Sequence, residues 1–259
     1  YYQYDHNKPP NKERPPFLYN FKKHNQLNVN LVLLRGAYQG KKWRANLALM
    51  AGNYADYNLA PEPTFFRYIN EANIGFVFSG KFSMDAGIFP SHIGLESAIA
   101  KDNWNLSRSI LAENTPYYET GIKFNYVHNE KWSFSALVLQ GWQNIKDHNS
   151  SKAFGTLIQY KPGEKWLFNS STFIGNEKPD SAKQVRFFHN FYFTYNISSK
   201  LKTAFLLDAG AEKKSNGNGI NGWAGTALLL QYAVSPKLNM GGRAEWYSDK
   251  DGVIVSSYL

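Results

Sequence analysis

The sequence predicts an all-β protein, a transmembrane antiparallel up-and-down β-barrel, and three observations support this fold class. Apolar residues alternate with polar or small ones in one run after another, as they do along a strand with one apolar face. Short and long connections between these runs alternate strictly along the chain. Each short connection ends in Lys, followed by an aromatic residue or Leu. Short periplasmic turns and long extracellular loops are typical of outer-membrane barrels.

The clearest pattern lies in the hairpin Glu71–Ile88. Every second residue is apolar on both sides of its SGK turn, from Ala72 to Phe78 and again from Phe82 to Ile88. Most residues between them are polar or small, so the hairpin has one apolar face. The same pattern predicts further strands, in chain order, at Gln26–Tyr38, Trp43–Tyr57, Tyr117–Val127, Trp132–Trp142, Ala153–Tyr160, Trp166–Gly175, Val185–Tyr195, Leu201–Glu212, Trp223–Val234 and Leu238–Ser248.

The connections between these strands fall into two classes. The short turns are QGKK, SGK, HNEK, KPGEK, NISSK and SPK, whereas Asn58–Asn70 and Pro90–Pro116 are long. A Lys at the headgroup level followed by an aromatic residue is typical of the girdle at a membrane interface. The predicted girdle residues are Trp43, Phe82, Trp132 and Trp166. The alternative is an ordinary turn Lys before a hydrophobic strand start.

The composition excludes several other classes of protein. There is no Cys, and the six His show no paired spacing, so we expect no metal and no cofactor. No run approaches the ~18 apolar residues of a membrane helix, but a barrel strand turns only alternate residues toward lipid. The net charge of +9 is spread over turns and loops, which argues against a nucleic-acid partner.

The number of strands predicts which way the apolar face points. About eight strands leave an interior that side chains can fill, so a barrel of about twelve with an apolar interior would enclose a void. We therefore expect the apolar face to meet lipid and the polar face to line an enclosed lumen. A sandwich of two sheets is the remaining alternative.

Four stretches of the chain resemble a known family. They are Ala45–Pro63, Gly87–Gly121, Phe173–Tyr192 and Arg243–Ile254, and the resemblance extends over essentially the full chain to the OmpL-like β-barrel porins, which are common in Bacteroidetes. It implies a multi-pass barrel in the outer membrane of a Gram-negative cell, with residues 1–259 as a single domain. Tyr1–Tyr4 looks like a strand end and Gly252–Tyr258 like the start of another strand, so we expect a processed or trimmed chain. Counting absent pieces, the intact barrel is expected to have about sixteen strands.

Polar and charged residues at alternate positions are predicted to line the lumen. They are Arg44, Asn46, Glu71, Asn73, Asp85, Glu119, Lys123, Asn125, Arg186, Asn190, Lys202, Asp208, Arg243 and Glu245. Cations and anions are nearly balanced among them, so the wall alone predicts a hydrated channel without strong ion selectivity. The alternative is that these groups pair with one another inside a plugged barrel.

The long connection Pro90–Pro116 is predicted to be an extracellular loop that folds into the barrel. It exceeds the length of an ordinary structureless connection, and its helix-like runs, Ser97–Lys101 and Leu106–Ala112, carry apolar anchors. The candidate residues for a pore constriction are Glu96, Lys101, Asp102, Arg108 and Glu113. An outer lid away from the permeation path is the alternative.

The function predicted from these features is passive or weakly selective diffusion of small hydrophilic solutes, without enzymatic activity. One alternative is a non-conducting structural or partner subunit of an outer-membrane assembly. Another is a hydrolase at the rim, for which Ser91, His92 and Asn103 form the best set. Expected partners are membrane lipid and lipopolysaccharide, whose phosphates would meet basic loops, and other outer-membrane proteins or further copies of the chain. The basic loop residues are Lys8, Lys12, Arg14, Lys22, Lys23, Lys213 and Lys214.

Overall fold

The structure, a computed structural model, describes residues 1–182, 184–215 and 218–255. Twelve strands form one antiparallel sheet in which each strand pairs with its neighbour in sequence, which confirms the predicted fold class. The strands are β1 (Val32–Gln39), β2 (Trp43–Ala51), β3 (Ile69–Val77), β4 (Phe82–Pro90), β5 (Tyr118–Val127), β6 (Trp132–Leu139), β7 (Ala153–Gly163), β8 (Trp166–Asn176), β9 (Val185–Asn196), β10 (Leu201–Lys213), β11 (Ile220–Ser235) and β12 (Leu238–Ser248).

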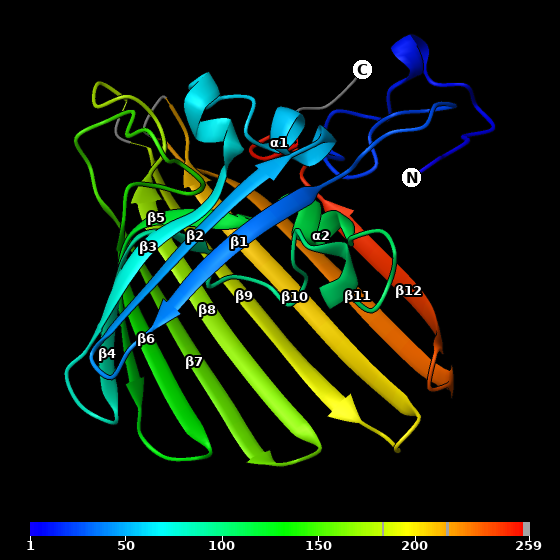
Figure 1. Cartoon of the computed structure of the whole chain (residues 1–259). Helices are drawn as coiled ribbons and strands as arrows, with labels where there is room; N and C mark the ends of the chain where they lie inside the picture. Colours follow the sequence, from blue (N-terminus) through cyan, green and yellow to red (C-terminus); the bar gives the residue numbers. More distant parts are fainter. Residues whose placement is uncertain (183, 216–217, 256–259) are drawn as a thin grey trace.

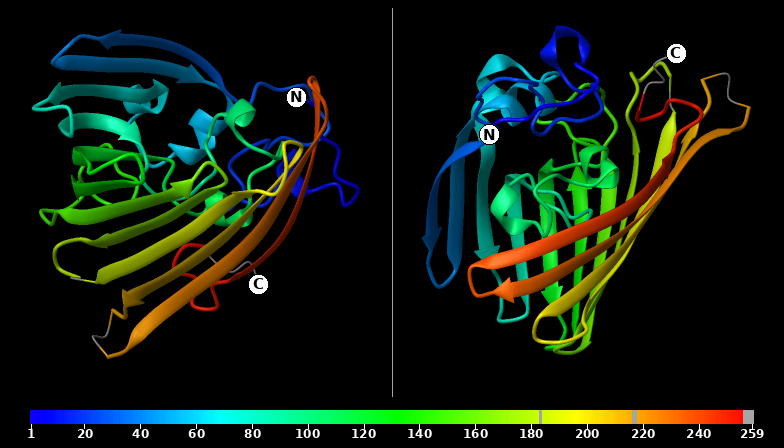
Figure 2. Two further views of the ribbon diagram at one scale, coloured as in Figure 1. Left: turned by 90° about the horizontal axis from the view of Figure 1, so that it is seen from below. Right: turned by 90° about the vertical axis from the view of Figure 1, so that its right-hand side faces the viewer.

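The short turns lie together at one end of the sheet, and the long connections lie at the other end (Figure 1). The sheet is strongly curved, and its concave face surrounds segments of the long connections (Figure 2). β1 and β12 are the edge strands, and no strand pairing joins them within the described part of the chain. The described residues contain twelve strands, where the sequence predicts about sixteen for an intact barrel.

Both terminal segments differ from the predicted extra strands. Residues 252–255 form no strand, because the Asp249 carboxylate accepts hydrogen bonds from the backbone N–H groups of Val253, Ile254 and Val255 and so bends the chain. The rest of that predicted strand, residues 256–258, lies outside the described residues. At the other terminus, Tyr1–Tyr4 forms only an isolated bridge, through Tyr2.

The first two predicted strands are longer than the observed ones. The predicted strand Gln26–Tyr38 begins only at Val32, because the carbonyls before it accept hydrogen bonds from α1 (Asn53–Asn58). The predicted strand Trp43–Tyr57 ends at Ala51. Gly52 then has a φ of 119°, which favours glycine and turns the chain into α1.

The remaining regular structure is short and belongs to the long connections. It consists of α2 (Ile110–Glu113) and the 3₁₀ turns η1 (Pro10–Lys12), η2 (Thr64–Tyr68) and η3 (Ala100–Asp102). Within the described ranges, no helix is both long enough and apolar enough to cross a bilayer.

The two faces of the sheet differ in polarity and in exposure. Ile74, Phe154 and Leu228 belong to the convex face, and their side chains are 52%, 55% and 45% exposed. The contrast is clearest within β9, where Phe187 is 48% exposed and the next residue, Phe188, is fully buried. The apolar stripe of the hairpin follows the same rule, because Phe82 is exposed and Phe76 is only partly buried. The apolar face thus points outward, as expected for a sheet that meets lipid.

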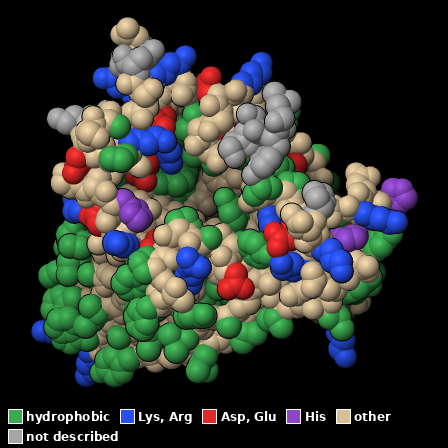
Figure 3. All heavy atoms as spheres, turned by 90° about the horizontal axis from the view of Figure 1, so that it is seen from above, with side chains coloured by type: hydrophobic (Ala, Val, Ile, Leu, Met, Phe, Trp, Pro, Cys, Tyr) green, Lys and Arg blue, Asp and Glu red, His purple; other side chains and the backbone are tan. Residues whose placement is uncertain are grey.

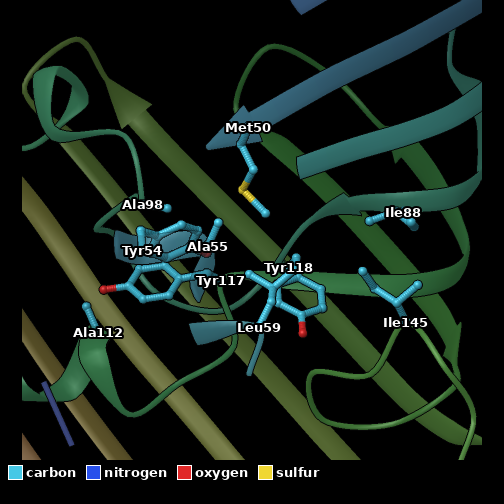
Figure 4. Packing of buried hydrophobic residues seen from close by; sticks show 10 residues of the cluster. All are labelled: Met50, Tyr54, Ala55, Leu59, Ile88, Ala98, Ala112, Tyr117, Tyr118 and Ile145. Carbon is cyan, nitrogen blue, oxygen red and sulfur yellow. The ribbon is translucent and has the colours of Figure 1, made fainter. Parts of the chain in front are cut away.

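A buried apolar cluster closes the loop end of the sheet. Met50, Tyr54, Leu59, Tyr117 and Tyr118 pack together with smaller side chains there (Figure 4). The whole cluster draws on β2, α1 and the residue just after it, β4, the long loop and the residue just after it, β5 and the β6–β7 connection, so residues distant in sequence meet in one core. This cluster ties α1 to the long loop and fixes where that loop begins and ends.

Candidate functional site

The long loop Pro90–Pro116 lies against the concave face of the sheet. The Arg243 guanidinium on β12 donates to the Ser107 carbonyl at 2.8 Å, and the Ile110 N–H donates to the Glu245 carboxylate at 2.7 Å. On β11, the Gln231 amide donates to the Trp104 carbonyl at 3.1 Å. The loop therefore crosses the inner side of β11 and β12, which are far from it in the sequence.

The loop contains less helix than its sequence predicts. Only η3 and the single turn α2 form within it, because side chains occupy the carbonyls that a longer helix would use. The Asn103 amide donates to the carbonyls of Ser97 and Ile99, and the Arg108 guanidinium donates to the carbonyls of Ser97, Ala98 and Leu106. Arg108 is 3% exposed, so it organises the loop from within.

The start of the loop is held by a buried ion pair between His92 and Glu119. Both side chains are fully buried, and His92 Nδ1 lies 2.9 Å from each carboxylate oxygen of Glu119. His92 Nε2 lies 2.8 Å from the Thr172 carbonyl on β8. Both ring nitrogens therefore face acceptors, an arrangement that suits a protonated imidazole. Burial by itself lowers the pKa of His92, but Glu119 and the Thr172 carbonyl raise it above the ordinary value overall.

The rim residues proposed for hydrolysis do not form a nucleophile–base pair. The Ser91 hydroxyl donates to Glu119 at 3.1 Å, and both His92 nitrogens are engaged elsewhere. Asn103 bonds only within the loop, to Ser97 and Ile99. No His nitrogen is placed to take a proton from Ser91, which is what such a site requires.

Most residues predicted to line the lumen lie on the concave face in hydrogen-bonded sets. Arg44 binds Asp85 through two contacts of 2.7 Å, and Asn125 donates to the same carboxylate at 2.9 Å. Arg186 and Glu212 form a buried ion pair at 2.6 Å. Further pairs on this face join Glu71 to Arg35, Asn73 to Asn46, Asp208 to Asn190, and Arg243 to Glu245.

Two lumen cations, Lys123 and Lys202, have ring contacts in place of carboxylate partners. Lys123 Nζ lies 4.8 Å from the centre of the Phe89 ring, and Lys202 Nζ lies 4.5 Å from that of Trp104. Among the described residues neither forms a salt bridge. The concave face thus combines neutralised pairs with two cations that aromatic rings support.

The five constriction candidates separate into two groups. Glu96 is partly buried and Glu113 is buried, and their carboxylates accept hydrogen bonds from Ser109 and from Tyr19 and Asn20, respectively. Burial raises the pKa of both carboxyls. Together with Arg108, they hold the loop in shape. Lys101 and Asp102 are exposed and line a cavity of about 570 Å³ between η3 and the inner side of β1, where Arg35 faces them.

The predicted girdle residues lie at the short-turn ends of their strands, in contact with other aromatic rings. Trp132 stacks on Tyr160 with ring centres 4.2 Å apart, and Trp166 stacks on Tyr195 at 4.0 Å. Trp43 and Phe82 have exposed side chains and contact Phe76 and Phe78. Ring contacts join the aromatic residues of the outer face into two rows, one from Trp43 to Phe124 and one from Tyr126 to Phe205, which together form an aromatic belt.

Sequence reasoning missed the apolar residues on the concave face. Phe89, Phe173, Phe188 and Trp223 form a buried cluster there, and Trp142 and Arg186 pack on it. The signal was present in β9, where Phe188 shares the inward parity of Arg186 and Asn190. At the loop end of the sheet the concave face therefore carries apolar as well as polar side chains, and Ile93 of the inward loop packs into the apolar cluster.

An outward apolar face, an aromatic belt and a loop seated on a polar concave face define a porin-like outer-membrane β-barrel. The whole chain, residues 1–259, matches the model of the family described as "Putative beta-barrel porin-2, OmpL-like". The chain belongs to this family. No curated protein sequence matches the chain.

Two solved structures of OmpT, an outer membrane protein of Vibrio cholerae, are similar to the chain. A mutant that lacks loop L8 is 8% identical, with a TM-score of 0.47 over 85% of this chain and 85% of that one. The in-vitro folded protein in its trimer form is 6% identical, with a TM-score of 0.48 over 85% of this chain and 80% of that one.

Proposed function

We propose that the protein is a channel in the outer membrane of a Gram-negative bacterium, for passive diffusion of small hydrophilic solutes, and that it is not an enzyme. The observation that carries this proposal is the cavity between the inner loop and β1. Arg35, Lys101 and Asp102 contribute charged groups to its lining, and the other lining residues are Asn30 and the apolar Phe21, Leu31, Leu33, Ile99 and Ala100. The loop itself is bonded to β11 and β12. A gap that carries two cations and a carboxylate beside an inward loop supports the proposal of a narrowed, water-filled pore.

Conductance of the full chain in planar bilayers tests the channel. We expect discrete openings, and we expect deletion of residues 97–113 to increase the conductance of each opening. Lys101→Glu should shift the reversal potential in a KCl gradient toward cation preference, because it inverts one of the charges that line the gap. Lys152→Glu, an equal charge change on an exposed side chain outside the gap, is the control. An unchanged reversal potential in Lys101→Glu would place the permeation path elsewhere.

The second candidate is a non-conducting barrel that serves as a structural or partner subunit. It is favoured by the apolar cluster of Phe89, Phe173, Phe188 and Trp223, each at most 4% exposed, which fills the concave face under the loop. A closed lumen of this kind would show no discrete openings in the full chain. Openings that appear only after deletion of residues 97–113 would identify the loop as a plug.

A further inference from the structure

A second cavity lies at the loop end of the molecule, away from the proposed gap. It has a volume of about 750 Å³, and the residues that line it come from the N-terminal segment, from α1 with the chain just after it, and from the β6–β7 connection. Two of the lining residues are cations, Arg14 and Lys22. Seen from above, Lys and Arg side chains are spread around this end of the molecule (Figure 3).

Lys22 is an unusually buried cation for a loop residue. It is 3% exposed, and the only hydrogen bond from its ammonium group within the described residues goes to the Pro15 carbonyl at 2.7 Å. Its Nζ also lies 5.4 Å from the centre of the Tyr57 ring. An ammonium group has three N–H donors, so two of them are not used by these contacts. Burial lowers the pKa of Lys22 to about 8.

The carboxylates nearest to Lys22 are already engaged by other groups. Glu13 pairs with Lys23 at 2.5 Å and accepts the Tyr57 hydroxyl at 2.6 Å. Glu113 accepts hydrogen bonds from the backbone N–H groups of Tyr19 and Asn20 and from the Asn20 amide. The Arg14 side chain forms no ion pair or hydrogen bond in the described part of the chain. The cavity therefore contains two cations and one carboxylate, and that carboxylate, Glu13, is already engaged by Lys23 and Tyr57.

The other residues that line the cavity indicate what kind of molecule would carry an anionic group to Lys22 and Arg14. The Tyr57 ring and the Pro16 and Pro61 side chains offer apolar surface beside the two cations, and Gln143 offers an amide. Aromatic and apolar surface suits the faces of a sugar ring, while amides suit its hydroxyl groups. Free phosphate would fill only a small part of a cavity of this volume.

We infer that this cavity binds a phosphorylated sugar, with Lys22 and Arg14 as the phosphate ligands. The phosphate accepts hydrogen bonds from both cations, which are strong because both partners are charged. The same chemistry occurs in a soluble sugar phosphate and in the headgroup of a phosphorylated glycolipid of the outer leaflet. The site is independent of the proposed pore, because none of its lining residues belongs to the gap beside β1.

Calorimetric titration of the full chain tests the site. Glucose 6-phosphate, added to protein in detergent micelles, should bind, while glucose should not. Lys22→Met and Arg14→Gln should each weaken binding about tenfold or more, since each removes a charge-assisted contact. Lys213→Met, which removes an exposed cation outside the cavity, should change the affinity less than twofold. Heat-dependent migration on gels would verify that each variant is folded.

Binding measured at different pH values and binding to a lipid complete the test. Binding should weaken as pH rises through about 8, where Lys22 loses its proton, and Lys22→Arg should keep its affinity over that range. Binding to nanodiscs with and without purified lipid A, a phosphorylated disaccharide lipid, distinguishes a glycolipid headgroup from a soluble sugar phosphate as the ligand. Binding of either ligand with loss in Lys22→Met supports the site. Failure of both ligands to bind, or an equal loss in Lys213→Met, would overturn it, whatever the channel measurements show.

Discussion

The attachment of the inner loop to β12 leads to a quantitative prediction. Arg243 holds the Ser107 carbonyl at 2.8 Å, and Glu245 holds the Ile110 N–H at 2.7 Å. Hydrogen bonds to charged groups contribute about 1.5–3 kcal/mol each, and these two are exposed, so the lower value applies to each. Removal of both in the variant Arg243→Ala/Glu245→Ala should cost about 3 kcal/mol of loop attachment. That equals about a hundredfold increase in the detached population.

Hydrogen exchange with mass spectrometry measures this population directly. The informative amides are those of Ala112 and Glu113, which donate to Ser109 and bond to neither substituted residue. Their exchange should become about 10–100-fold faster in the double variant, because local opening sets their protection. The control is Arg35→Ala, which removes an inner-face cation whose hydrogen bonds, within the described residues, go to Glu71 and Asn46 and not to the loop. Unchanged exchange in the double variant, or equal acceleration in the control, would refute the anchoring role.

Three further predictions concern the pair, the core and the belt. The raised pKa of His92 means that its pair with Glu119 stabilises the fold fully below about pH 6.5 and less as pH rises through the folded-state pKa, with Lys123 as the nearby cation. In urea unfolding, the free energy of unfolding should fall as pH rises through this range, and Glu119→Gln should abolish this pH dependence. Phe188→Ala should lose about 3–5 kcal/mol of unfolding free energy in the same assay, while the lipid-facing Phe187→Ala should lose less than half as much. The fluorescence of Trp166 is the difference between the unmodified protein and Trp166→Phe. Lipids brominated near the headgroup should quench it more than lipids brominated at the bilayer centre, and the reverse order would contradict an interfacial belt.

The geometry of the pairs explains why the candidate site was predictable only in part. Strand parity in the sequence was enough to place Arg44 and Asp85 on one face. Arg44 on β2 and Asp85 on β4 both lie beside Gly75 of β3, and their side chains meet over this glycine at 2.7 Å. Parity could not show that Glu113 and Arg108 would be buried and hold the loop in shape, while Lys101 and Asp102 would stay exposed. Those outcomes depend on which carbonyls of the loop are free to accept hydrogen bonds from side chains. That is set by the path of the loop, which has no periodic signal in the sequence.

The sequence by itself determined the strands, their order, the short-turn end and the face that meets lipid. These follow from a two-residue period and from turn chemistry, which are local properties of the chain. Only the tertiary structure decided that the loop lies on the concave face, that His92 pairs with Glu119 and that an apolar cluster forms inside the sheet. Each of these joins residues that are distant in sequence, such as His92 and Glu119, which are 27 positions apart, and such contacts are selected by packing and by the satisfaction of buried polar groups.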